Sequence, residues 1–83
     1  MRSKISTSGR ITILLGKYQV ATGERMSPRK LAGKAGVPKD LVYRLDSGTA
    51  RHVDIDALSR LCAVLDCQPQ DILIWESERA ESV

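Results

Sequence analysis

The side chains best suited to bond-making chemistry in this sequence are one histidine, His52, and two cysteines, Cys62 and Cys67. Four residues separate the cysteines, whereas the cysteine pair of a zinc knuckle is separated by two. A structural zinc takes four ligands, so these three side chains leave the set incomplete. No phosphate-cradling glycine run or pair of convergent acids accompanies them. The sequence therefore predicts no enzyme, no metal site and no cofactor, and both cysteines are expected to be plain, buried thiols.

A second group of side chains offers hydrogen bonds instead of reactions: Lys39, Asp40, Tyr43 and Arg44. In a helix over about 38–46, with about 100° between successive residues, these four lie on one side. The apolar Leu41, Val42 and Leu45 lie on the other side. Arg and Lys donate to O6 and N7 of guanine, and Asp accepts from the amino group of cytosine. Such a face is suited to reading G·C base pairs.

Each of these side chains also has a plainer interpretation. Asp40 and Arg44 are spaced to form an i,i+4 ion pair on a solvated helix. Tyr43 lies against a sugar or a thymine methyl group in one interpretation and covers the edge of the core in the other. The sequence alone does not decide whether Asp40 and Arg44 bind each other or DNA, or whether Tyr43 faces DNA or the core.

Charge is divided unevenly along the 83 residues, although the net charge is only +3. Residues 1–52 carry a balance of +8, and residues 53–83 a balance of −5. A basic half favours nucleic acid or another anionic surface as the partner.

The length of the chain allows one small domain. The longest apolar run, 61–65, is far shorter than the roughly twenty residues of a membrane span, and no signal peptide is visible, so we expect a cytoplasmic protein without a membrane partner.

Five helical segments are expected to position these side chains. An extended piece near 10–13 leads into a helix at 14–22, which Gly23 ends. Ser27 and Asp54 are good N-caps, and three prolines stand at helix starts. The remaining helices are expected at about 28–35, 38–46, 55–65 and 69–73. Residues 74–75 are expected to be extended.

The second and third of these helices are joined by about three residues, including Gly36. So short a connection makes the helices cross steeply, and Ala32 is small where the third helix presses closest. Val42 and Leu45 supply the core anchors. This combination predicts a helix-turn-helix unit whose second helix enters a DNA major groove.

Basic side chains flank this unit. Arg29, Lys30 and Lys34 lie on the helix that crosses the DNA backbone in such a motif, and Arg51 and His52 follow the third helix. Phosphate contact is the expected role of all five, with a solvated surface as the alternative. Arg2 and Lys4, in an arm expected to be flexible, are candidates for a minor groove.

At these residues the sequence resembles the lambda-repressor-like helix-turn-helix regulators, also called the XRE family, in a compact single-domain subgroup. The resemblance runs from Ile11 to Leu73, and its marks are the segments 27–32, 35–37, 42–48, 58–62 and 65–73. It implies an all-α, five-helix bundle, with short extended ends, that binds operator DNA as a transcriptional regulator. It also implies that the protein is a repressor or activator, usually a dimer, and repression is our prediction.

By position, the resemblance assigns base reading to Lys39, Asp40 and Arg44. It places four further side chains near phosphates: Ser27, Ser47, Thr49 and Arg51. Pro28 stands where the family often has Gln, and Pro38 where it often has a Ser or Thr cap. Two contacts to DNA that other members make are therefore missing from this chain.

We expect a flexible basic arm at 1–9, the DNA-binding domain at 10–75 and a flexible acidic tail at 76–83. The apolar ends, Ile11 and Ile13 on one side and Ile74 and Trp75 on the other, either pair within one chain or form a subunit contact. A weak or DNA-assisted homodimer is expected. Two alternatives use the same bundle: an antitoxin-type module with a protein partner, and an interaction domain that binds no nucleic acid.

Overall fold

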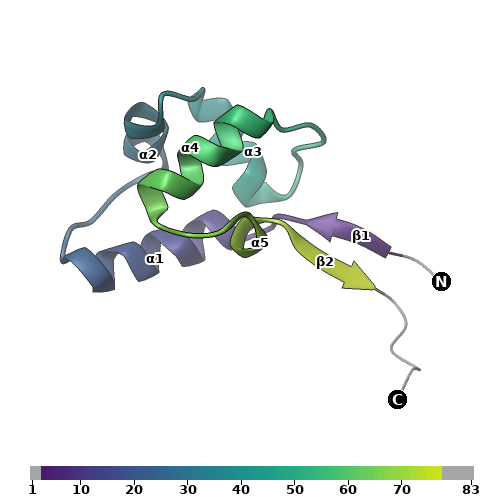
Figure 1. The fold of residues 1–83 in the computed structure, drawn as a ribbon, viewed down its shortest axis with the longest axis horizontal. Helices are drawn as coiled ribbons and strands as arrows, with labels where there is room; N and C mark the ends of the chain where they lie inside the picture. Colours follow the sequence, from purple (N-terminus) through teal and green to yellow (C-terminus); the bar gives the residue numbers. More distant parts are fainter. Residues whose placement is uncertain (1–2, 78–83) are drawn as a thin grey trace, which may run out of the picture.

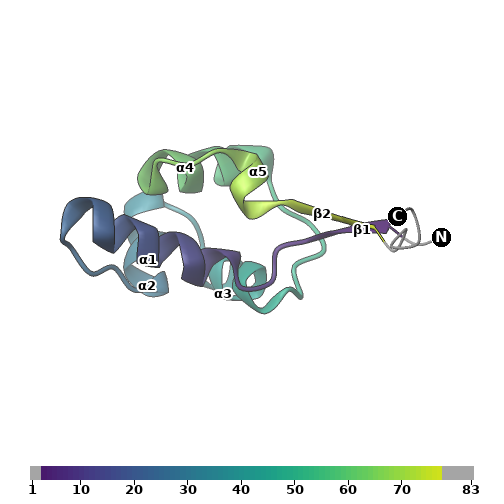
Figure 2. The same ribbon diagram turned by 90° about the horizontal axis from the view of Figure 1, so that it is seen from below.

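A computed structural model of the chain describes residues 3–77, which form five helices and two short strands (Figure 1). In chain order these are β1 (Ser3–Ser6), α1 (Arg10–Thr22), α2 (Pro28–Ala35), α3 (Lys39–Ser47), α4 (Ile55–Leu65), α5 (Pro69–Ile72) and β2 (Ile74–Ser77). The helices gather into one body, and the two strands form a ribbon that extends from it (Figure 2). The predicted all-α bundle with short extended ends is confirmed.

Local signals account for most helix boundaries. The Ser27 hydroxyl accepts a hydrogen bond from the Lys30 backbone N–H at 3.1 Å, and the Asp54 carboxylate accepts one from Ala57 at 3.0 Å. Each bond satisfies an N–H group that the first turn leaves without a partner. The starts of α2 and α4 were predictable for this reason.

The start of α1 differs from the prediction. Residues 10–13, expected to be extended, are its first turn, and Gly9 before them adopts a left-handed conformation without a side-chain cap. The cap comes from α3 instead: the Asp46 carboxylate accepts from the Thr12 backbone N–H at 3.0 Å and from the Thr12 hydroxyl at 2.7 Å. Because the capping residue lies 34 positions away, the residues around Gly9 carry no sign of it.

The arm expected to be flexible at 1–9 is also different in the structure. Residues 3–6 form β1, which pairs with β2 in antiparallel register, so that Ile5 lies opposite Trp75 and Lys4 opposite Glu76. The chain ends therefore do pair within the molecule. The N-terminal partner is 3–6, not 10–13. Residues 76 and 77 of the expected tail belong to β2, whereas Arg2 and residues 78–83 lie outside the described residues.

The core takes side chains from every helix. The largest ones with almost no exposure are Ile11, Leu31, Val42, Leu45, Leu61 and Ile72. Burying an aliphatic side chain of this size stabilises the fold by about 1.5–3 kcal/mol. Because all five helices contribute, none of them keeps its apolar face covered without the others.

Two hydrogen bonds fasten the C-terminal end of α3 to the segment before α1. The buried Thr7 hydroxyl donates to the Leu45 carbonyl at 2.6 Å, and the Gly9 N–H donates to the Asp46 carbonyl at 2.8 Å. Together with the Asp46 cap on Thr12, they fix where α3 lies on α1.

The two cysteines are free thiols at the end of α4, Cys62 buried and Cys67 half-buried. The Cys67 N–H donates to the Cys62 carbonyl at 3.0 Å, which brings the residues together. Burial, and then the neighbouring Cys62, raises the pKa of the Cys67 thiol to about 12.

Within residues 3–77, no helix is long and apolar enough to cross a membrane, and no cluster of His, Cys, Asp and Glu suits a metal ion.

Replacing Asp46 by Ala should lower the free energy of unfolding by about 1–2 kcal/mol, because α1 loses the cap on its first turn. Urea denaturation followed by circular dichroism measures this loss. Asp56→Ala is the matched control, since Asp56 makes an exposed ion pair with Arg60 and its loss should cost less than about 0.5 kcal/mol. Equal losses in the two variants would contradict the capping role.

The raised pKa of Cys67 predicts slow alkylation and a pH-dependent stability. The folded state favours the neutral thiol, so this contribution to stability is complete below the ordinary pKa of 9.0 and is lost as the pH rises from 9 toward 12. Iodoacetamide at pH 8 should modify Cys67 much more slowly in the folded protein than in urea, as measured by peptide mass spectrometry. Equal rates in both states would show that the thiol is not protected.

Candidate nucleic-acid interface

The turn between α2 and α3 brings the two helices into close contact. Gly36 has φ 70°, a conformation that ends α2 cleanly, and the Val37 N–H donates to the Ala32 carbonyl at 3.0 Å. Ala32 is 3% exposed, so its small side chain lies within the helix contact. This is the short helix-turn-helix connection, from Gly36 to Pro38, that the sequence predicted.

The packing of α3 decides which of its sides meets the solvent. Val42 and Leu45 are buried and Leu41 packs against the core. The predicted base-reading residues all lie on the exposed side: Lys39, Asp40, Tyr43 and Arg44. Tyr43 is 48% exposed, so it is available on the surface instead of filling the core edge.

Asp40 and Arg44 form the i,i+4 ion pair that was an alternative interpretation of these residues. The Arg44 Nε lies 3.3 Å from the Asp40 carboxylate, and both side chains are largely exposed. Such a pair contributes only a few tenths of a kcal/mol. A guanine edge or a phosphate would compete with it at little cost, so the pair leaves Arg44 available to DNA.

The residues predicted to contact phosphates come from two segments, one before α3 in the chain and one at its C-terminal end. On α2, Arg29, Lys30 and Lys34 are exposed. The Ser27 hydroxyl accepts the capping bond from Lys30, which leaves its own hydrogen free to donate. The structure thus brings Ser27 and Lys30 together at the start of α2.

The other residues predicted to contact phosphates lie at the end of α3 and in the loop that follows it. The Ser47 and Thr49 hydroxyl oxygens are 2.9 Å apart, and Ser47 also donates to the Arg44 carbonyl at 3.2 Å. Arg51 and His52 follow in an exposed loop. Hydroxyl and basic groups therefore adjoin one another where the chain leaves α3.

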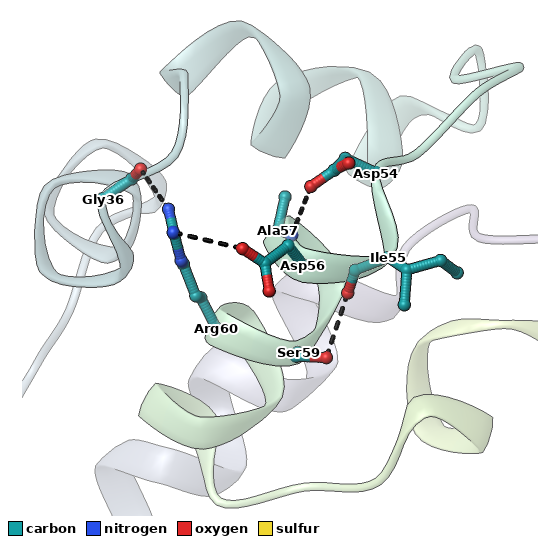
Figure 3. Close-up of polar contacts among 7 residues, drawn as sticks. All are labelled: Gly36, Asp54, Ile55, Asp56, Ala57, Ser59 and Arg60. Carbon is teal, nitrogen blue, oxygen red and sulfur yellow. Dashed lines mark hydrogen bonds and ion pairs between the residues drawn. The ribbon is translucent and has the colours of Figure 1, made fainter.

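One positioning residue lay outside the predicted site. Arg60 of α4 donates from Nη1 to the Gly36 carbonyl at 3.4 Å and from Nη2 to Asp56 at 3.2 Å, and so links α4 to the turn (Figure 3). The i,i+4 spacing of Asp56 and Arg60 was visible in the sequence. The contact with Gly36, 24 residues away, was not.

Comparison with known protein families matches residues 20–78 to the Cro/C1-type HTH DNA-binding domain. The chain therefore belongs to this family of helix-turn-helix DNA-binding domains, as the sequence resemblance predicted. It is also 32% identical over 54 residues to YozG of Bacillus subtilis (strain 168), an uncharacterized HTH-type transcriptional regulator. The aligned region covers 65% of this chain and 64% of the length of YozG. No solved structure matches the chain.

Two glycines of the helix-turn-helix region should respond in opposite ways to alanine. Gly48 has φ 80°, and an added Cβ would lie 3.1 Å from the Ser8 Cβ, so Gly48→Ala should cost at least about 1–2 kcal/mol. Gly33 is helical with open space around it, so Gly33→Ala should stabilise by up to about 1 kcal/mol. Thermal and urea unfolding of both variants test this, and a destabilised Gly33→Ala protein would contradict it.

Proposed function

We propose that the chain is a sequence-specific, DNA-binding transcriptional regulator that reads the major groove with α3 and acts as a repressor. The observation that carries the proposal is the exposed polar side of α3, held out by the buried Val42 and Leu45 and by the short turn at Gly36. Membership of the DNA-binding family supports it. Repression needs only that the protein occupy its site.

The proposed roles follow from side-chain chemistry. Lys39 and Arg44 donate to guanine, Asp40 accepts from cytosine, and Tyr43 lies against a sugar or a thymine methyl group. The remaining candidate residues neutralise or hydrogen-bond phosphates on either side of the groove: Ser27, Arg29, Lys30, Lys34, Ser47, Thr49, Arg51 and His52. Phosphate contacts set position and base contacts set the preferred sequence.

The proposed assembly is a weak or DNA-assisted homodimer in the cytoplasm. α3 has nine residues, and one such helix contacts only a few base pairs. Two copies on a palindromic site, related by a two-fold axis, would read two half-sites. A longer site discriminates better against the rest of a genome.

Arg44→Ala and Lys30→Ala should differ in kind. Arg44→Ala should cost about 1–3 kcal/mol on the preferred site and relax the preference at one base pair per half-site. Lys30→Ala should weaken binding to all sequences about equally and reduce the magnitude of the negative slope of log affinity against log salt by about one for each phosphate that is no longer neutralised. Selecting bound genomic fragments at near-physiological salt gives the site, and titrations of both variants at several salt concentrations give the comparison.

Both substitutions are on exposed side chains, so circular dichroism should show intact helices in each variant. Asp40→Asn serves as the companion to Arg44→Ala, because it removes the ion pair and keeps Arg44. An Arg44→Ala protein with unchanged base preference would show that α3 does not read the groove. No salt-dependent affinity for any DNA would reject the proposed function altogether.

A further inference from the structure

A groove opens where β1 leaves the helices, beside the loop that joins α3 to α4 (Figures 1 and 2). Its volume is about 230 Å³. An enclosed cavity of about 150 Å³ holds one benzene molecule, so this open groove has room for two fused six-membered rings. Most of the side chains that line it are apolar: Ile5, Leu45, Ala50, Val53 and Leu73. The size and the lining suit a small, planar, apolar molecule.

The polar side chains at the groove decide which charge its occupant carries. The buried Thr7 hydroxyl already donates to the Leu45 carbonyl at 2.6 Å. Arg51 and His52 are exposed, line the groove and make no hydrogen bond or ion pair with the rest of residues 3–77. No carboxylate from that part of the chain lines the groove. An anionic group is therefore favoured, and a carboxylate accepts two parallel hydrogen bonds from a guanidinium.

We propose that this groove is an effector site for a small aromatic carboxylate, which weakens DNA binding when it is bound. The rings lie on the apolar lining, and the carboxylate accepts hydrogen bonds from Arg51 and His52. The inference rests on the proposed function, in which the same two side chains contact DNA phosphates. Because a carboxylate and a phosphate compete for these donors, each ligand lowers the affinity for the other by the same factor.

The groove also adjoins the helix proposed to read bases. Leu45 lines the groove and is 1% exposed, since it anchors α3 in the core. The Ala50 N–H donates to the Arg44 carbonyl at 3.1 Å, so the loop that carries Arg51 is tied to the last turn of α3. An occupant of the groove thus contacts both α3 and the segment that holds the proposed phosphate contacts.

The site is tested first without DNA, with 2-naphthoate as the probe and 2-naphthol as its uncharged analogue. In two-dimensional NMR spectra of the full chain, 2-naphthoate should shift the signals of Ala50, Val53 and Leu73 in a saturable way. We expect a dissociation constant of about 1 mM or lower, and binding of 2-naphthol at least about fivefold weaker. Equal affinity for the two probes, or shifts confined to residues outside the groove, would overturn the proposal.

Two variants separate the apolar lining from the charge. Ala50→Leu fills part of the groove and should raise the dissociation constant of 2-naphthoate at least about tenfold. Ala63→Leu, on the exposed side of α4 and outside the groove, is the matched control and should bind the probe unchanged. Arg51→Gln should bind 2-naphthoate no better than 2-naphthol. Circular dichroism checks the helices, and if Ala50→Leu fails to fold, Arg51→Gln decides, since a retained preference for 2-naphthoate would overturn the site.

The effect on DNA is measured with saturating 2-naphthoate, and acetate at the same concentration is the ionic control. The affinity for the preferred site should fall at least about fivefold, and Ala50→Leu should not show this loss. Bound 2-naphthoate that leaves DNA affinity unchanged would overturn the effector role. A chain that binds no DNA rejects the proposed function, while the titrations without DNA still test the groove. Loss of 2-naphthoate binding at rising protein concentration would assign the groove to a second copy and overturn the proposed occupant.

Discussion

Asp46 makes the contact on which the placement of α3 depends. Its carboxylate caps α1 through Thr12, its carbonyl accepts from Gly9, and the preceding carbonyl accepts from the buried Thr7 hydroxyl. A helix start needs partners for its N–H groups. Here α3 provides them, so the helix that presents Arg44 to the solvent is also the helix that completes α1. The same residue of α3 therefore both caps α1 and holds the two helices against each other.

The proposed interface combines a rigid frame with loosely held side chains. The frame consists of the buried contacts of α3 and the short turn, which Arg60 joins to α4 through the Gly36 carbonyl. On the exposed side, the Asp40–Arg44 pair is solvated and weak. Little free energy is lost when such side chains turn to a base edge. In the proposed interface, the frame would set where contacts to DNA form, and the exposed side chains would set which bases they suit.

The strands β1 and β2 bring together two segments that lie far apart in the sequence. β1 and β2 are separated by all five helices and pair only because α1 and α5 lie together, where Arg10 donates to the Asp71 carbonyl at 2.6 Å. Their pairing leaves Ile5 and Trp75 on one exposed face.

The sequence by itself determined four of the helices, the turn at Gly36 and the exposed side of α3, because caps, prolines and helical periodicity are local properties. The family assignment followed from the same residues. Only the tertiary structure decided that α1 begins at Arg10, since its cap lies on Asp46, and that residues 3–6 form a strand, since their partner lies at 74–77. Interactions between residues far apart in the chain leave no local pattern, because they exist only once the core has brought those residues together.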